Sequence, residues 1–139
     1  MTESDLFANI KDIVELKLIR DYVALEDNKS GNINLQLVND HFMNKNGLIM
    51  FYSPACPHCK NMLPKFKQLG EILKGSFPLG TINCVDAPSG NDLLGDYFKI
   101  EAYPTIKYYN NGTYTDYSGG HNVKDFLNYL CKTNGLCNF

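Results

Sequence analysis

The sequence predicts an α/β domain whose central mixed β-sheet is flanked by helices, with an N-terminal extension ahead of it. An apolar run at 48–52 leads through two cysteines directly into an amphipathic segment, which is the order of a buried strand, a turn and a helix. Two β-forming segments flank Asn110-Asn111-Gly112, which is a strong hairpin signal. At 139 residues, the chain is long enough for one compact domain with its own core.

The first 31 residues carry two competing patterns. Four apolar residues have the spacing of one helical face: Leu6, Ile10, Ile13 and Val14. Three alternate as in a strand: Val14, Leu16 and Leu18. We predict a helix followed by an extended segment. Residues 1–31 would then form a mainly helical extension, residues 32–132 the domain and residues 133–139 a C-terminal tail.

The strands of the domain are predicted at 33–35, 48–52, 79–85, 104–109 and 113–117. The first alternates in polarity, the second is a continuous apolar run and the third is rich in β-forming residues. The last two form the two arms of the hairpin.

Helices are predicted between these strands, at 39–44, after the two cysteines, at 92–98 and at the C-terminal end. The second helix has an apolar face formed by Met62, Phe66, Leu69 and Leu73. Pro64 lies inside it and should kink it, because proline lacks a backbone donor. The last helix has an apolar face formed by Val123, Phe126, Leu127 and Leu130, and Asn122 can cap it.

Cys56 and Cys59 form a Cys-x-x-Cys pair at the junction of strand and helix. The first turn of a helix offers unpaired backbone N–H groups and the positive end of the helix dipole. Both favour the thiolate over the thiol, so the pKa of a cysteine there falls. The alternative is half of a zinc site, but the sequence has no second Cys-x-x-Cys or His-x-x-x-His pair to complete four ligands. We therefore expect redox chemistry, with no metal and no cofactor.

Residues 51–60 resemble the active-site signature of protein disulfide isomerase domains in the thioredoxin superfamily. In both, an aromatic pair, a small residue and a proline precede Cys-x-x-Cys-Lys, and a proline such as Pro64 follows eight residues after the first cysteine. Tyr103-Pro104-Thr105 resembles the cis-proline strand of the family, and residues 117–120 with the last helix match the end of its domain. The resemblance covers roughly 32–132 and implies a thioredoxin fold.

The dipeptide between the cysteines, Pro57-His58, differs from the Gly-His of most isomerases and the Gly-Pro of thioredoxins. It matches the Pro-His of the bacterial oxidase DsbA. A histidine beside the Cys56 sulfur adds a donor or a positive charge that stabilises the reduced form. The disulfide is then expected in the oxidising half of a range from about −270 mV for thioredoxin to about −120 mV for DsbA.

Two further positions depart from the isomerase pattern. Relatives place a buried acid six residues before the first cysteine, where it helps to move the proton of the second, whereas this chain has Met50. Proton transfer must then use water or another group, or the release of mixed disulfides is slow. Ala55 replaces the tryptophan usually found before the first cysteine, which removes a contact surface and could widen or weaken substrate choice.

The resemblance assigns roles to the site residues. Cys56 is expected to be the nucleophile, Cys59 the resolving cysteine, and His58 the group that poises Cys56. Pro57, Tyr103 and Pro104 are expected to bind substrate: Tyr103 and Pro104 form a platform whose backbone pairs with the substrate strand.

The other three cysteines have structural explanations of their own. Cys84 ends a buried strand and is expected to be a silent core residue. Cys131 and Cys137 lie six residues apart where the last helix should end. They form a structural disulfide, two free thiols or a second redox pair, and the sequence leaves these alternatives open.

The composition limits which binding partners and which cellular locations are expected for the protein. The net charge is −2 and the lysines are dispersed, so no nucleic acid is expected. The chain begins with an acidic segment and shows no signal peptide or membrane segment, which favours the cytoplasm. A signal sequence that had been trimmed would instead place the protein in a secretory compartment. Sixteen Asn and few Arg are typical of A/T-rich genomes, including those of protists and large DNA viruses, for which the host cytoplasm or the virion would be the location.

We therefore predict a thiol–disulfide oxidoreductase that acts on protein cysteines in the oxidase or isomerase direction. Its partners would be protein thiol and disulfide substrates, with a flavin-dependent sulfhydryl oxidase to accept its electrons. Two alternatives stay open: a thioredoxin-like reductase, and a non-catalytic interaction or chaperone module on the same fold. The oligomeric state is not predicted.

Overall fold

The computed structural model describes residues 13–15, 36–43, 45–73, 77–85 and 91–137. Its five strands are β1 (Ile13–Glu15), β2 (Asn46–Tyr52), β3 (Leu79–Asn83), β4 (Thr105–Asn110) and β5 (Thr113–Asp116). Its helices are α4 (Gln36–His41), α5 (Pro57–Leu73), α6 (Asn91–Tyr97) and α7 (Val123–Asn134).

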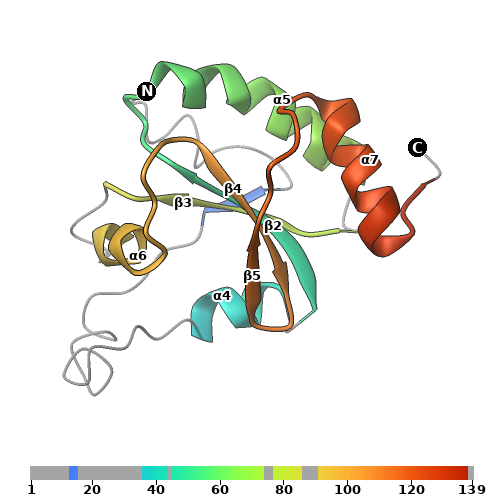
Figure 1. Ribbon diagram of the computed structural model, residues 1–139, viewed down its shortest axis with the longest axis horizontal. Helices are drawn as coiled ribbons and strands as arrows, with labels where there is room; N and C mark the ends of the chain where they lie inside the picture. The colour runs from blue at the N-terminus through green and yellow to red at the C-terminus, as the bar shows by residue number, and fades with distance from the viewer. Residues whose placement is uncertain (1–12, 16–35, 44, 74–76, 86–90, 138–139) are drawn as a thin grey trace.

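The strands form one mixed sheet in the order β1-β3-β2-β4-β5. β3 runs parallel to both β1 and β2, whereas β4 pairs antiparallel with β2 and with β5. Helices α5 and α7 lie on one side of the sheet, and α4 and α6 on the other (Figure 1). The predicted α/β fold with a mixed sheet between helices is therefore confirmed.

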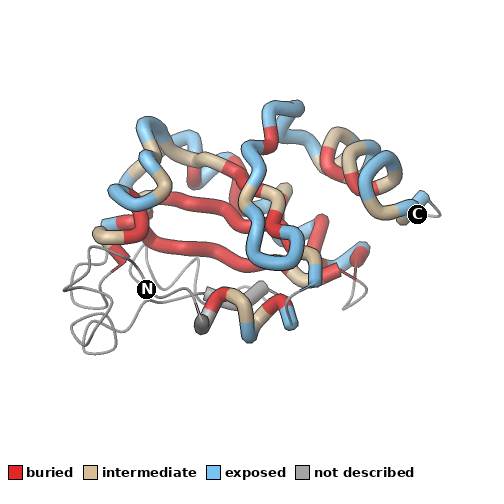
Figure 2. The backbone as a smooth tube through the Cα atoms, turned by 60° about the horizontal axis from the view of Figure 1, so that its bottom comes forward, coloured by how far each residue is buried: buried red, intermediate tan, exposed pale blue. Residues whose placement is uncertain are grey.

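Each face of the sheet has its own core. Under α5 and α7 the core includes Leu48, Met50, Phe66 and Phe126. On the opposite face it includes Phe42, Ile49, Phe51 and Tyr109. All residues of β2 after Asn46 are buried, because a central strand is covered on both sides (Figure 2). This continuous burial explains the apolar run seen in the sequence.

Several predicted boundaries were wrong. Ile13 and Val14 belong to strand β1 instead of a helix, because they pair with Leu79 and Gly80 of β3. The helix predicted at 39–44 begins and ends earlier, and Met43 after it has a positive φ of 53° that no α-helix accommodates. The strand predicted at 79–85 ends at Asn83.

Other predictions agree with the structure or concern residues that the structure does not describe. α5 continues through the exposed Pro64, and the kink expected there stays a prediction. α7 begins after Asn122, as predicted. The Asn122 backbone N–H donates to the Asp125 carboxylate at 3.2 Å, which helps to fix the start of α7. The strand predicted at 33–35 and most of the extension at 1–31 lie outside the described residues.

Candidate active site

Cys56 stands directly before the first residue of α5. Its backbone N–H donates to the Ser53 carbonyl at 3.1 Å, and its own carbonyl accepts from the Lys60 N–H at 3.2 Å. This places Cys56 at the N-cap, the position from which a side chain reaches the free N–H groups of the first turn. Pro57 follows at the first helical position, where its missing N–H costs nothing.

The surroundings of the Cys56 sulfur favour its thiolate. Burial raises the pKa of this thiol, but hydrogen bonds from the Cys59 backbone, the Cys59 side chain and the His58 backbone outweigh burial, so the net pKa is lowered. The two backbone N–H groups, of His58 and Cys59, belong to the first turn of α5, where the sequence predicts such donors. Cys56 is also half-buried and not bonded to another sulfur, so it combines access with reactivity.

Cys59 lies one turn further into α5 and is fully buried. Burial raises the pKa of this thiol to about 12; a backbone hydrogen bond from Ser53 opposes the shift, and the neighbouring Cys56 reinforces it. The two thiols therefore differ: the pKa of Cys56 is lowered and that of Cys59 is raised, so Cys56 ionises at a lower pH than Cys59. This division suits an attacking and a resolving cysteine.

His58 is exposed, and it meets the Cys56 sulfur through its backbone N–H. Among the described residues, its imidazole has no hydrogen-bond partner. The proposed effect of the imidazole on Cys56 stays a prediction. Met50, in the position of the missing acid, is fully buried between Thr81 and Ile106 on the neighbouring strands.

Tyr103 and Pro104 lie opposite Cys56, joined by a cis peptide bond. The Cys56 thiol points at the Tyr103 carbonyl, with 3.5 Å between sulfur and oxygen. The Thr105 hydroxyl donates to the Ala102 carbonyl at 2.7 Å, which closes the loop before β4. Residues 47 positions apart in the sequence are thus in contact at the site.

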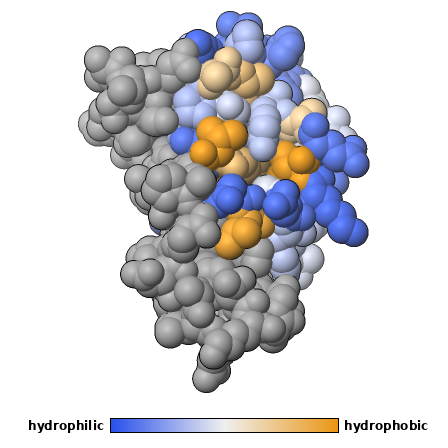
Figure 3. Space-filling model, turned by 90° about the vertical axis from the view of Figure 1, so that its left-hand side faces the viewer, coloured by the Kyte–Doolittle hydropathy of each residue, from blue (hydrophilic) through white to orange (hydrophobic). Residues whose placement is uncertain are grey.

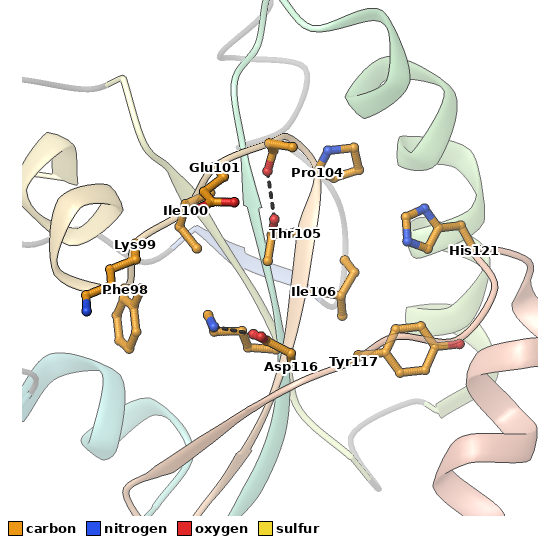
Figure 4. A pocket seen from close by; sticks show the side chains of 12 residues that line it. Phe98, Lys99, Ile100, Glu101, Pro104, Thr105, Ile106, Asp116, Tyr117 and His121 are labelled. Carbon is orange, nitrogen blue, oxygen red and sulfur yellow. Dashed lines mark hydrogen bonds and ion pairs between the residues drawn. The ribbon is translucent and has the colours of Figure 1, made fainter.

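A cavity of about 630 Å³ opens beside Pro104, at the place where β5 separates from β4 (Figure 4). Lys99 and Glu101 lie on one side of it and His121 on the other, and the ion pair of Lys107 with Asp116 crosses its floor. No local pattern in the sequence predicts this cavity, because its walls come from β4, β5 and loops that are far apart in the chain.

Cys131 and Cys137 form a disulfide with a Cα–Cα distance of 4.6 Å. This disulfide links the last turns of α7 to the residues that follow the helix. The C-terminal end of α7 is far from the start of α5, where Cys56 lies (Figure 1). Gly135, with a φ of 71°, donates to the Cys131 carbonyl, and the Leu136 N–H donates to the Leu130 carbonyl, which is the Schellman ending of a helix.

Within the described ranges, no group of three or more His, Cys, Asp and Glu side chains is placed to hold a metal ion. None of the helices that the structure describes combines the length and the apolar character needed to cross a membrane.

Comparison with known proteins agrees with this geometry. The profile of the thioredoxin family matches residues 28–132, so the chain belongs to this family. It is 42% identical over 89 residues to protein disulfide-isomerase A3 of Gallus gallus, a match that covers 62% of this chain and 17% of that protein. It is 34% identical over 88 residues to protein disulfide-isomerase 1 of Caenorhabditis elegans, covering 63% and 18%. The chain thus spans about a fifth of the length of these relatives.

Solved structures show the same fold. The J-Trx1 fragment of ERdj5 superimposes with a TM-score of 0.69 at 16% identity, covering 91% of this chain and 54% of that one. The Trx4 domain of ERdj5 gives a TM-score of 0.58 at 21% identity, covering 72% and 90%.

Proposed function

We propose that the protein is a thiol–disulfide oxidoreductase that acts on protein cysteines through Cys56 and Cys59. The observation that carries this proposal is the contrast between an accessible Cys56 with a lowered thiol pKa and a buried Cys59 with a raised one. Relatives named as protein disulfide-isomerases support the same chemistry.

In the oxidising direction, the reaction begins with a disulfide between Cys56 and Cys59. A substrate thiolate attacks the Cys56 sulfur, the bond to Cys59 breaks, and Cys59 leaves as a thiolate that takes up a proton. A second substrate thiolate attacks the substrate sulfur of this mixed disulfide and releases Cys56 as its thiolate. The substrate gains a disulfide, and the protein holds the two electrons as a dithiol.

The favoured direction of thiol–disulfide exchange depends on which redox form of the protein is the more stable one. Hydrogen bonds that favour the Cys56 thiolate stabilise the reduced protein, which makes the disulfide more oxidising. With the dithiol in excess, Cys56 can instead attack a wrong disulfide and allow it to rearrange. The oxidase or isomerase direction is therefore favoured over the reductase alternative.

Substrate would bind across the loop before β4. The Tyr103 backbone faces Cys56, and the cavity beside Pro104 begins one residue away. An extended segment next to the substrate cysteine can lie along Tyr103 and Pro104 and place its side chains in the cavity. Figure 3 views the end of the molecule where α6 and the start of α5 lie, and small apolar areas alternate with polar ones on its described part.

Location and electron partner complete the proposal. The isomerase relatives do not support the cytoplasmic location expected from the sequence, and the Cys131–Cys137 disulfide favours an oxidising compartment. We place the protein there, with a flavin-dependent sulfhydryl oxidase as the acceptor that restores the Cys56–Cys59 disulfide.

The test is oxidative refolding of a reduced, denatured protein whose native state needs disulfides, with glutathione as the terminal redox buffer. The wild type should raise the yield of native disulfides, and the Cys56→Ser variant should not. Equal refolding with the two proteins would favour the non-catalytic chaperone alternative.

A further inference from the structure

The cavity beside Pro104 has a buried positive group in its floor. Lys107 lies on β4 with a side chain that is only 11% exposed, although lysine is almost never buried without a partner. Its ammonium pairs with the Asp116 carboxylate of β5 and lies 5.9 Å from the centre of the Phe98 ring (Figure 4). All three residues line the cavity. A buried cationic donor therefore lies where we expect substrate side chains to enter.

The two members of this ion pair differ in how far they are buried. The Asp116 side chain is 75% exposed, so water solvates its carboxylate when the ammonium is taken from it. The Lys107 ammonium has no such alternative, because an unpaired charge in a buried position is costly. An incoming carboxylate can therefore replace Asp116 at little cost, whereas an incoming ammonium that captured Asp116 would leave Lys107 unpaired. This asymmetry favours acidic over basic side chains in the cavity.

The rest of the lining is compatible with an acidic side chain. Lys99, Glu101 and His121 are exposed at the walls, where salt screens their charges, and Lys99 offsets Glu101. Ile106 and Tyr117 are buried lining residues that offer apolar surface to the methylene groups of a glutamate. The strongest electrostatic preference in the cavity therefore comes from its buried ammonium.

The buried ammonium is within reach of a polypeptide bound at the redox site. The Tyr103 carbonyl oxygen lies 3.5 Å from the Cys56 sulfur, and Lys107 follows Tyr103 by four residues. Four residues of an extended strand span about 13 Å. A substrate residue about two to four positions from the reacting cysteine covers part of this distance with its backbone and the rest with its side chain.

We propose that the cavity beside Pro104 is a subsite for an acidic side chain, in which Lys107 binds the carboxylate of a glutamate near the substrate cysteine. This inference rests on the proposed function of Cys56 and Cys59, and it names the class of polypeptide that the site selects. An ammonium has three N–H donors, so Lys107 can bind the substrate carboxylate while it keeps Asp116 or after it releases Asp116.

The experiment uses pairs of cysteine peptides that differ only in glutamate or glutamine at one position, two, three or four residues from the cysteine. Each peptide is supplied as its mixed disulfide with 2-mercaptoethanol, which carries no charge. Steady-state exchange gives kcat and KM for the wild type, Lys107→Met and Asp116→Asn. Lys124→Met is the matched control, since Lys124 is an exposed lysine of α7 outside the cavity lining and its loss changes the net charge equally.

At one of these positions, we expect the wild type to have a KM about five- to tenfold lower for the glutamate peptide, the size of a partly solvated hydrogen bond to a charged group. The kcat should change little, because the contact is the same before and during the reaction. Lys107→Met should abolish the preference, Asp116→Asn should increase it by removing the competing carboxylate, and Lys124→Met should keep it. Equal KM values for every peptide pair, or a preference that survives Lys107→Met, would overturn the proposal.

Binding without exchange separates this inference from the proposed function. The same peptides with serine in place of cysteine are titrated against each variant, and their affinity is measured by fluorescence anisotropy. A glutamate preference in binding that depends on Lys107, with no exchange by the wild type, would support the subsite and contradict the role of Cys56. Exchange without any glutamate preference would do the reverse.

Thermal melting identifies a variant that fails to fold. If Lys107→Met does so, Asp116→Asn decides, because the proposal requires this variant to prefer glutamate more strongly than the wild type. An unchanged or lower preference in Asp116→Asn would then overturn it.

Discussion

Cys56–Cys59 and Cys131–Cys137 are two pairs of cysteines at opposite ends of two helices that cover the same face of the sheet. The first pair opens α5, where backbone N–H groups point at the Cys56 sulfur and lower its thiol pKa. The second pair closes α7, where the neighbouring groups are carbonyls, and its sulfurs are joined. The helix dipole favours a thiolate at the first place and disfavours it at the second.

The comparison shows that the position of a cysteine pair on its helix affects its reactivity separately from the spacing of the two cysteines in the sequence. Both pairs are close in sequence, and each includes a cysteine that is exposed or half-buried, yet only the first has donors that stabilise a leaving thiolate. A disulfide whose thiolates are not stabilised exchanges slowly, because the leaving thiol keeps an ordinary pKa or a higher one. From this placement on the helices, we propose that Cys56 carries out the exchange and that Cys131 has a structural role.

The largest effect is expected from removing the first pair. Cys56→Ser should reduce disulfide exchange to the uncatalysed rate, because the attacking sulfur is lost. Cys59→Ser should form mixed disulfides that persist, and these can be seen by mass spectrometry. The matched control is Cys131→Ser with Cys137→Ser, which should keep the exchange rate; a comparable loss there would contradict the separation of roles.

A large difference is also expected between the two thiols of the reduced site. Because the pKa of Cys56 is lowered, its alkylation should persist at a pH where an ordinary cysteine is protonated, and should decline only as the pH falls through the lowered value. Cys59, with a pKa raised to about 12, should stay unreactive in the folded protein at neutral pH. Peptide mapping after iodoacetamide treatment at several pH values measures both.

The raised pKa values also predict the alkaline stability of the reduced protein. The folded state keeps Cys59 and Cys84 protonated, with pKa values of about 12, where the unfolded chain ionises them from about pH 9. Their contribution to stability is therefore complete below pH 9 and is lost as the pH rises toward 12. Urea unfolding across this range should show a falling midpoint, and a flat profile would contradict the burial of these thiols.

A smaller effect is expected from opening the second pair. Closing a loop of this length stabilises a protein by about 2 kcal/mol in the chain-entropy description. The Cys131→Ser, Cys137→Ser variant should lose about this much in urea unfolding while its Cys56 alkylation profile stays unchanged. A shifted profile would show that the two ends of the molecule are coupled.

The smallest effect is expected at His58, and it distinguishes the backbone from the ring. His58→Ala keeps the N–H that meets the Cys56 sulfur, whereas His58→Pro removes it at a position in the first helical turn that tolerates proline. We expect His58→Pro to raise the pKa of Cys56 more than His58→Ala, as measured by alkylation. The reverse order would assign the effect to the imidazole, as the sequence analysis proposed.

Local patterns in the sequence were enough for most of the fold. The apolar run of β2, the spacing of Met62, Phe66 and Leu69 in α5, and the turn at Gly112 each reflect contacts within one element. Ile13 and Val14 were assigned wrongly because their strand is defined by pairing with β3, which lies more than 60 residues away. Local spacing cannot report such pairing.

Features of the site also differ in whether the local sequence is enough to predict them. The placement of Cys56 at the start of a helix could be derived from residues 48–73 alone. The placement of Cys84 beside Gly95 could not, because it joins the end of β3 to α6. The same holds for the cavity beside Pro104, whose walls come from three separate segments.

The most direct test is to measure the reduction potentials of both pairs in the same wild-type protein. The protein is equilibrated in a series of glutathione buffers, its thiols are trapped, and each pair is quantified by peptide mass. We predict about −120 to −180 mV for Cys56–Cys59 and a value below about −300 mV for Cys131–Cys137. A value near about −270 mV for the first pair, or a common value for the two, would contradict the assignment of exchange chemistry to helix placement.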